Sequence, residues 1–181
     1  MSIPRKQSVS LRPDFATSPT TKEALQYLDS LMQPDVCQMT TGMRYGDNVK
    51  YVRVGIPAKM FAEIQLMQIT DVQFGHVACR YDRVIEYRDW ILAEPNRFML
   101  WGGDMIDAAT KISVGDPWEN LAGPARQIFK FCEVWAPARH RILGYVGGNH
   151  ERRGQTTYGD LGSAIAAFLK IPYSMGRQAI D

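Results

Sequence analysis

Hydrophobic and polar positions change their spacing along the chain, and these changes predict where helices and strands alternate. The segment 20–32 opens with the capping-box sequence Thr20-Thr21-Lys22-Glu23 and continues with leucines at helical spacing, so we expect a helix that ends before Pro34. Residues 49–54 alternate apolar and polar side chains, as a half-exposed strand does.

Three strands and three helices are then expected in strict alternation. In chain order, these predicted elements cover residues 64–70, 77–94, 98–101, 117–135, 142–146 and 160–170. Gly123-Pro124 is expected to kink the second helix or to divide it in two, and residues 171–173 to begin a further strand. Such alternation is typical of an α/β protein with a largely parallel inner sheet.

The chain of 181 residues is long enough for one domain with a substantial core. We expect residues 61–181 to form the α/β domain. Residues 1–60 would form an N-terminal extension with a mobile arm, one helix and a strand or hairpin. The role of this extension is open, since it could pack against the sheet or bind a partner.

Composition and charge leave most classes of soluble protein open. With 45% hydrophobic residues and a net charge of +2, the chain neither favours nor excludes a polyanionic partner. Cys37, Cys79 and Cys132 are far apart and form no CxxC pair, which argues against a zinc knuckle or a disulfide framework and favours reduced thiols in a cytoplasmic protein. No apolar run approaches the roughly 18 residues of a membrane span, so no membrane partner is expected.

Polar residues follow the end of each predicted inner strand. They are Asp71, Asp104 and Asn149, and His150 comes directly after the last of them. In open α/β sheets, ligands bind at the edge where the parallel strands end. Because all three polar residues belong to this edge, we expect them to lie close together.

Each of these residues also has an explanation without function. Asp71 and Asp104 could cap the helices that follow them, because Asp is a favoured N-cap residue. His150 alone could be an ordinary loop histidine. His140 stands between two arginines and is expected at the surface, and Arg152-Arg153 could either attract a polyanion or form a solvated loop pair.

Three sequence blocks in this order resemble those of a known enzyme family. The blocks are Asp71-Val72-Gln73, Gly103-Asp104-Met105-Ile106-Asp107 and Gly148-Asn149-His150-Glu151. Together they are similar to the Asp-x-His, Gly-Asp-x-x-Asp and Gly-Asn-His-Glu/Asp blocks of the calcineurin-like metallophosphoesterases. The resemblance covers about residues 62–155 and implies an α/β sandwich with flanking helices.

The resemblance implies a site for two divalent metal ions. Asp71 and the residue at position 73 would bind the first metal, Asp104 would bridge the two metals, and Asn149 would bind the second metal through its amide oxygen. Two such ions can clamp a phosphoryl group and activate a water molecule as hydroxide.

The same resemblance implies roles for the neighbouring residues. His150 would be the catalytic residue, which contacts the phosphate together with Asn149 and protonates the leaving oxygen. Asp107, Glu151 and His76 would lie behind the ligands and orient ligands or loops.

The chain departs from the family at two points. Gln73 stands where the family usually has His, and this exchange of imidazole for an amide oxygen favours Mn or Mg over Zn, with Fe as a further possibility. His76 could compensate. The family also has histidines after the Asn-His block, but here none follows His150. We therefore expect a sandwich that is incomplete at the C-terminus: a fragment, a chain completed by a further segment or second chain, or a degenerate family member.

The sequence thus favours a metal-dependent phosphoesterase that hydrolyses a phosphomonoester or phosphodiester. Its substrate could be a nucleotide, DNA or RNA, although no basic stripe or stacking platform stands out. The alternative is a catalytically incomplete fragment, or a non-catalytic binding or assembly module that retains the fold.

Overall fold

The structure is a computed structural model that describes residues 20–33, 35, 38–44, 49–57, 59–109, 119–153, 155, 159–176 and 178–180. The helices are α1 (Thr21–Leu31), α2 (Tyr81–Ala93), α3 (Pro124–Trp135), the 3-10 helix η2 (Ala136–Arg141), α4 (Asn149–Arg153) and α5 (Leu161–Leu169). The strands are β1 (Gln38–Arg44), β2 (Val49–Gly55), β3 (Gln65–Ile69), β4 (Arg97–Trp101), β5 (Ile142–Val146), β6 (Tyr173–Ser174) and β7 (Gln178–Ile180). The predicted mobile arm and Cys37 lie outside the described residues.

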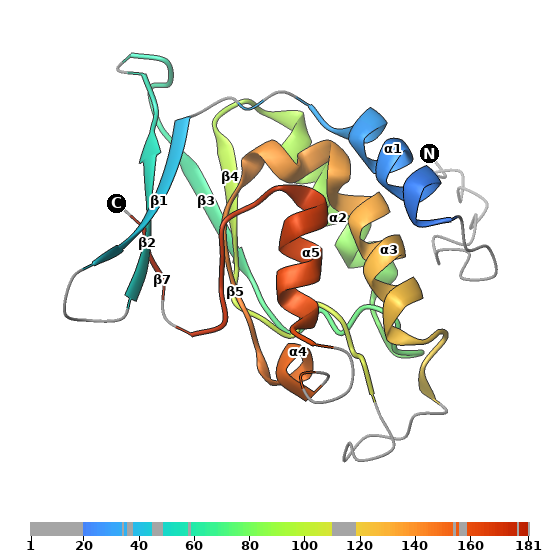
Figure 1. Cartoon of the computed structure of the whole chain (residues 1–181). Coiled ribbons are helices and arrows are strands. Elements are labelled where there is room, and N and C mark those ends of the chain that lie inside the picture. The colour runs from blue at the N-terminus through green and yellow to red at the C-terminus, as the bar shows by residue number, and fades with distance from the viewer. Residues whose placement is uncertain are drawn as a thin grey trace, which may run out of the picture.

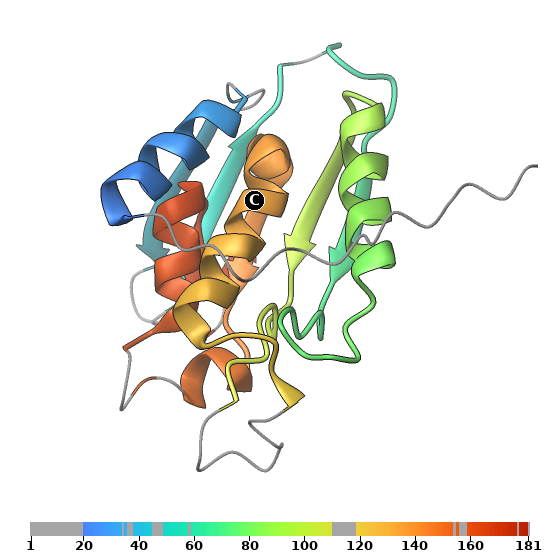
Figure 2. The same ribbon diagram turned by 90° about the vertical axis from the view of Figure 1, so that its right-hand side faces the viewer.

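A sheet of four parallel strands, in the order β3-β4-β5-β6, forms the centre of the molecule. The helices that connect these strands lie on one face of the sheet, and Figure 2 shows them in front of it. This arrangement confirms the predicted α/β class and its parallel inner sheet. It follows from the sequence because each apolar strand is followed by an amphipathic helix that returns the chain to the start of the next strand.

A smaller sheet packs on the opposite face (Figure 1). Its order is β1-β2-β7, with β1 antiparallel and β7 parallel to β2. Phe98 and Leu143, from the central sheet, are buried against Met39 and Val54 of the small sheet. Strands from both ends of the described chain therefore share one sheet, and the proposed division at residue 60 stays a prediction.

Aromatic rings fill the space between the helices and the central sheet. Trp101 of β4 makes edge-to-face contacts with Phe131, Trp135 and Tyr145 at centroid distances of 5.1, 5.3 and 5.5 Å. Such pairs contribute about 0.5–1.5 kcal/mol each beyond their buried area. The cluster fixes α3 against the carboxyl ends of β4 and β5, where the predicted site residues follow.

The capping-box helix is confirmed as α1, in which Thr20 and Glu23 cap each other. Two other helix starts differ from the prediction. Helix α3 begins at Pro124, with Gly123 as its N-cap, because proline fits the first helical turn and stops a helix that would cross it. Helix α2 begins at Tyr81 rather than at residue 77.

The expectation that His140 lies at the surface is wrong. His140 belongs to η2 and is only 5% exposed. Burial, together with the positive charges of Arg141 and Arg139, lowers the pKa of His140 to about 4. Across the described part of the chain, no helix is both long and apolar enough to cross a membrane.

Candidate functional site

The three strand-end loops meet at one edge of the central sheet, the lower edge in Figure 1. The Asp71 N–H donates to the Gly103 carbonyl at 3.1 Å, and the Gln73 N–H donates to the Asp104 carbonyl at 2.9 Å. The third loop packs directly on the second, because a Cβ added at Gly148 would lie 2.5 Å from the Asp104 backbone nitrogen. Only glycine at position 148 allows this approach.

The backbone of these loops is strained. Asp71, Gln73, Asp104 and Ala108 have positive φ angles of 55°, 48°, 55° and 46°. Each such conformation costs a non-glycine residue about 1–2 kcal/mol, and residues held in this way cluster at functional sites. Three of the four residues predicted to bind metal therefore lie in conformations that the surrounding hydrogen bonds must hold.

Neither aspartate caps the α-helix that it was expected to precede. The N-cap of α2 is Arg80 and that of α3 is Gly123, so Asp71 and Asp104 do not cap the α-helices that follow them in the described chain. The Asp104 side chain instead reaches the start of α4, where its Oδ1 accepts a hydrogen bond of 2.8 Å from the backbone N–H of His150. The expectation that Asp71 and Asp104 cap the helices α2 and α3 is therefore wrong.

The fully buried carboxylate of Glu151 joins the second and third loops. Its Oε1 accepts from the Met105 N–H and the Tyr145 hydroxyl, each at 2.8 Å. Its Oε2 accepts from the Asp104 N–H at 3.0 Å and the Gly148 N–H at 2.8 Å. Four donors satisfy this buried charge, and they fix the backbone on both sides of Asp104.

Asn149 lies beside Asp104 at the first turn of α4. In one orientation of its amide, the nitrogen donates to Asp104 Oδ2 at 2.8 Å and the oxygen accepts from Arg153 Nη2 at 3.2 Å. In this orientation the amide oxygen, the atom predicted to bind the second metal, faces Arg153 rather than Asp104.

The His150 ring is held from behind. Its Nδ1 lies 2.6 Å from the Asp107 carbonyl oxygen and 3.2 Å from Asp107 Oδ1, so Nδ1 carries a proton and donates it. The remaining nitrogen, Nε2, is the one that can gain or lose a proton near neutral pH. Burial lowers the pKa of His150, but the hydrogen bonds to Asp107 outweigh burial, and the pKa is raised above its ordinary value.

His76 has both ring nitrogens engaged. Nδ1 accepts from the Ala78 N–H at 3.0 Å, which leaves the proton on Nε2, 3.3 Å from Glu119 Oε2. A neutral imidazole with these partners has no free lone pair for a metal. The idea that His76 compensates for Gln73 therefore gains no support from its contacts.

The predicted metal ligands form two pairs. Asp104 and Asn149 are in direct contact, whereas Asp71 and Gln73 line a neighbouring pocket and donate their backbone N–H groups to the carbonyls of Gly103 and Asp104. Among the described residues, no three His, Cys, Asp or Glu side chains are placed to hold a metal ion. The predicted ligand set contains two carboxylates and two amides, and amides are not among the side chains that define such a cluster.

Sequence reasoning left two alternatives open for Arg153, a residue that attracts a polyanion or a member of a solvated loop pair. The guanidinium of Arg153 lies 3.2 Å from His150 Nδ1 and reaches the Asn149 amide at the same distance. Residues four positions apart face each other on a helix, so the spacing of Asn149 and Arg153 could have predicted this contact. The prediction would have required knowing that residues 149–153 form a helix.

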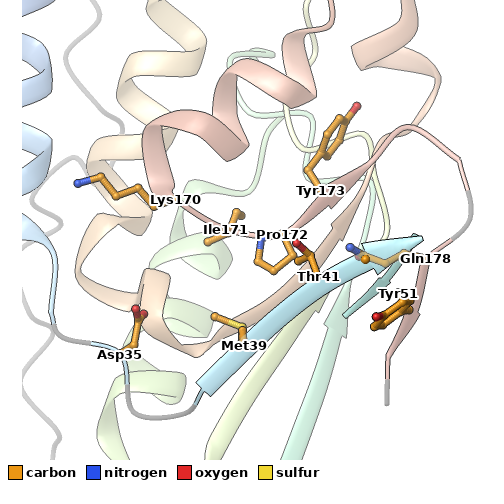
Figure 3. A pocket seen from close by; sticks show the side chains of 10 residues that line it. Asp35, Met39, Thr41, Tyr51, Lys170, Ile171, Pro172, Tyr173 and Gln178 are labelled. Atoms are coloured by element: carbon orange, nitrogen blue, oxygen red, sulfur yellow. The ribbon is translucent and has the colours of Figure 1, made fainter. Parts of the chain in front are cut away.

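A separate pocket of about 530 Å³ lies between β1 and the segment from Lys170 to Tyr173 (Figure 3). None of the predicted site residues lines it. The candidate site is therefore the strand-end cluster of Asp71, Gln73, Asp104, Asn149 and His150. A scan against protein-family models, a search of curated proteins and a search of solved structures each find no match to this chain.

Proposed function

We propose that this chain is a metal-dependent phosphoesterase with the sandwich fold of the calcineurin-like metallophosphoesterases. The observation that supports the proposal is the contact of Asp104 with both Asn149 and His150, at strained loops that a buried carboxylate holds together. The order of the three sequence blocks along the chain supports the family.

Asp71, Gln73, Asp104 and Asn149 would hold two divalent ions. All four offer oxygen donors, a set that suits Mn or Mg better than Zn. Bound ions of this kind supply a nucleophile at neutral pH and stabilise charge on a phosphoryl group.

The protein's own groups would then position and protonate the substrate. His150 holds its Nδ1 proton on Asp107, which orients the ring and leaves Nε2 to deliver a proton to the leaving oxygen. Arg153, next to Asn149 and His150, would add positive charge for an anionic substrate.

Hydrolysis of bis(p-nitrophenyl) phosphate with added Mn tests the proposal. We expect Mn-dependent release of nitrophenol that falls at least about 100-fold in His150→Ala and Asp104→Ala. Asp89→Ala, an exposed change on α2, is the control and should retain activity. Titration calorimetry should show Mn binding that Asp104→Ala weakens. Absence of activity, or activity that survives both site changes, would refute the enzyme.

The alternative is a binding or assembly module, and exposed apolar side chains favour it. Ile64, just before edge strand β3, and Leu66, within it, are 51% and 56% exposed. If the module is correct, Leu66→Lys should abolish capture of a partner while Mn-dependent hydrolysis stays absent.

A further inference from the structure

Strand β3 has one unpaired backbone edge. In the described part of the chain, it is an edge strand of the central sheet and pairs with β4 alone. The Gly102 N–H, just after β4, donates to the Ile69 carbonyl at 2.8 Å, so the backbone of Ile69 faces β4. Successive residues of a strand direct their backbone groups to opposite sides, so the N–H and C=O groups of Leu66 and Gln68 point away from the sheet.

The unpaired edge of β3 lacks the features that usually protect an edge strand. Charged side chains, proline and bulges are the common protections, because a free edge is a template for another strand. The sequence of β3 is QLMQI, which contains neither a charged residue nor proline. Its exposed Leu66, and the exposed Ile64 just before it, add apolar surface. The edge is therefore suited to pair with an added strand.

A pocket of about 570 Å³, the edge pocket, lies along this edge between β3 and the start of α2. One side of it is the continuous segment of residues 68–73, which begins in β3. The other side includes Val84 and Tyr87 of α2, which contribute apolar surface. A strand edge on one side and a helix on the other fit a peptide in extended conformation.

The α2 side of the edge pocket is positively charged. Arg80 and Arg83 line it, and Asp71 is the one carboxylate among the described residues that line it. Arg80 uses Nε and Nη2 for Asp82, and Arg83 uses Nη1 for Glu86, so each guanidinium keeps further donors. Because both ion pairs are largely exposed, another carboxylate can compete for the arginines at little cost. The pocket therefore favours a peptide with an acidic side chain.

We propose that the free edge of β3 and the edge pocket bind an extended peptide segment of a partner protein, with an acidic side chain of that segment at Arg80 and Arg83. The main chain of the segment would pair with the backbone of Leu66 and Gln68, while the arginines select its side chains. A second copy of this chain is a poorer occupant, because β3 has no acidic residue to place beside the arginines. Binding of this kind goes beyond phosphoester hydrolysis and does not depend on it.

Fluorescence anisotropy with two labelled hexapeptides tests the charge preference. One peptide alternates valine and glutamate, and the other alternates valine and lysine. We expect the glutamate peptide to bind at least about fivefold more tightly, the value of one or two exposed ion pairs. Arg83→Glu should reverse this preference. Arg126→Glu, an exposed change on the first turn of α3 and outside the edge pocket, should leave it intact.

Two N-methylated forms of the glutamate peptide test the strand pairing. Methylation of the valines and methylation of the glutamates remove N–H groups that face opposite edges of the peptide strand. Only one of these edges faces β3, so one form should lose at least about tenfold in affinity and the other should keep it. Gln68→Pro, which removes an N–H on the free edge of β3, should weaken binding of the unmodified peptide to a similar extent. If Gln68→Pro fails to fold, the methylated peptides and Arg83→Glu still decide.

Equal affinity for the glutamate and lysine peptides, or equal effects of the two methylations, would overturn the proposal. Sedimentation that shows a dimer, lost in Gln68→Pro, together with no peptide binding, would overturn it in favour of a second copy. Hydrolysis of bis(p-nitrophenyl) phosphate separates these failures from failure of the proposed function. Hydrolysis without peptide binding removes only the docking surface, and peptide binding without hydrolysis removes only the enzyme.

Discussion

Replacement of Glu151 by Gln measures how far the buried carboxylate holds the site loops together. Glutamine keeps the shape but places an NH2 group where one oxygen was. The least costly orientation puts this nitrogen at the Oε1 position, because the Tyr145 hydroxyl can rotate and accept from it. The Met105 N–H then loses its acceptor, while the Asp104 and Gly148 N–H groups keep a neutral one.

The magnitude follows from these contacts. One buried N–H without an acceptor costs about 1–3 kcal/mol, and each of the two remaining hydrogen bonds loses about 1 kcal/mol when its acceptor loses charge. We therefore expect Glu151→Gln to lower the free energy of unfolding by about 4 kcal/mol. For a chain of this size, the melting temperature would fall by about 12 °C.

Thermal and urea unfolding followed by circular dichroism provide the assay. Glu86→Gln is the control, because it removes one exposed ion pair with Arg83 and should change stability by less than about 0.5 kcal/mol. Hydrogen exchange should show the Met105 amide losing protection in Glu151→Gln. If Glu151→Gln is as stable as Glu86→Gln, the reasoning on the buried carboxylate is refuted.

Three more predictions concern burial and close packing. Folding lowers the pKa of His140 from 6.5 to about 4, so protonation favours the unfolded chain. The free energy of unfolding is therefore full above pH 6.5 and falls by up to about 3 kcal/mol toward pH 4. His140→Phe should flatten this part of the pH dependence measured by urea unfolding. Gly148→Ala should destabilise by about 2–4 kcal/mol, because its Cβ would lie 2.7 Å from Asp104 Cγ. Gly176→Ala is the control: no atom lies within 4 Å of its added Cβ, so the melting temperature should change by no more than a few degrees. Equal effects of the two changes would contradict the close packing at Gly148. Burial raises the pKa of the Cys132 thiol, so maleimide at pH 8 should label Cys132 far more slowly than the partly exposed Cys79, as mass spectrometry of peptides would show, and equal rates would disprove the burial.

Much of the fold could be predicted from local patterns. The helix at 21–31, the strands β2 to β5 and the helix α5 agree with the predicted elements to within a few residues. The three residues of β7 could not be predicted, because their pairing with β2 joins segments more than 120 residues apart, whereas β1 pairs antiparallel with the nearby β2. Pairing partners supply the hydrogen bonds that make such short segments strands.

The sequence alone determined which residues stand at the carboxyl ends of the inner strands, because strand spacing and chain order are local properties. It therefore placed Asp71, Asp104 and Asn149 at one edge. Only the tertiary structure decided which side chains meet there: Asp104 with His150 and Asn149, and Glu151 with two loops. It also decided that His140 is buried and that a pocket opens beside Asp71. These outcomes depend on which surfaces pack together, and spacing along one chain does not contain that information.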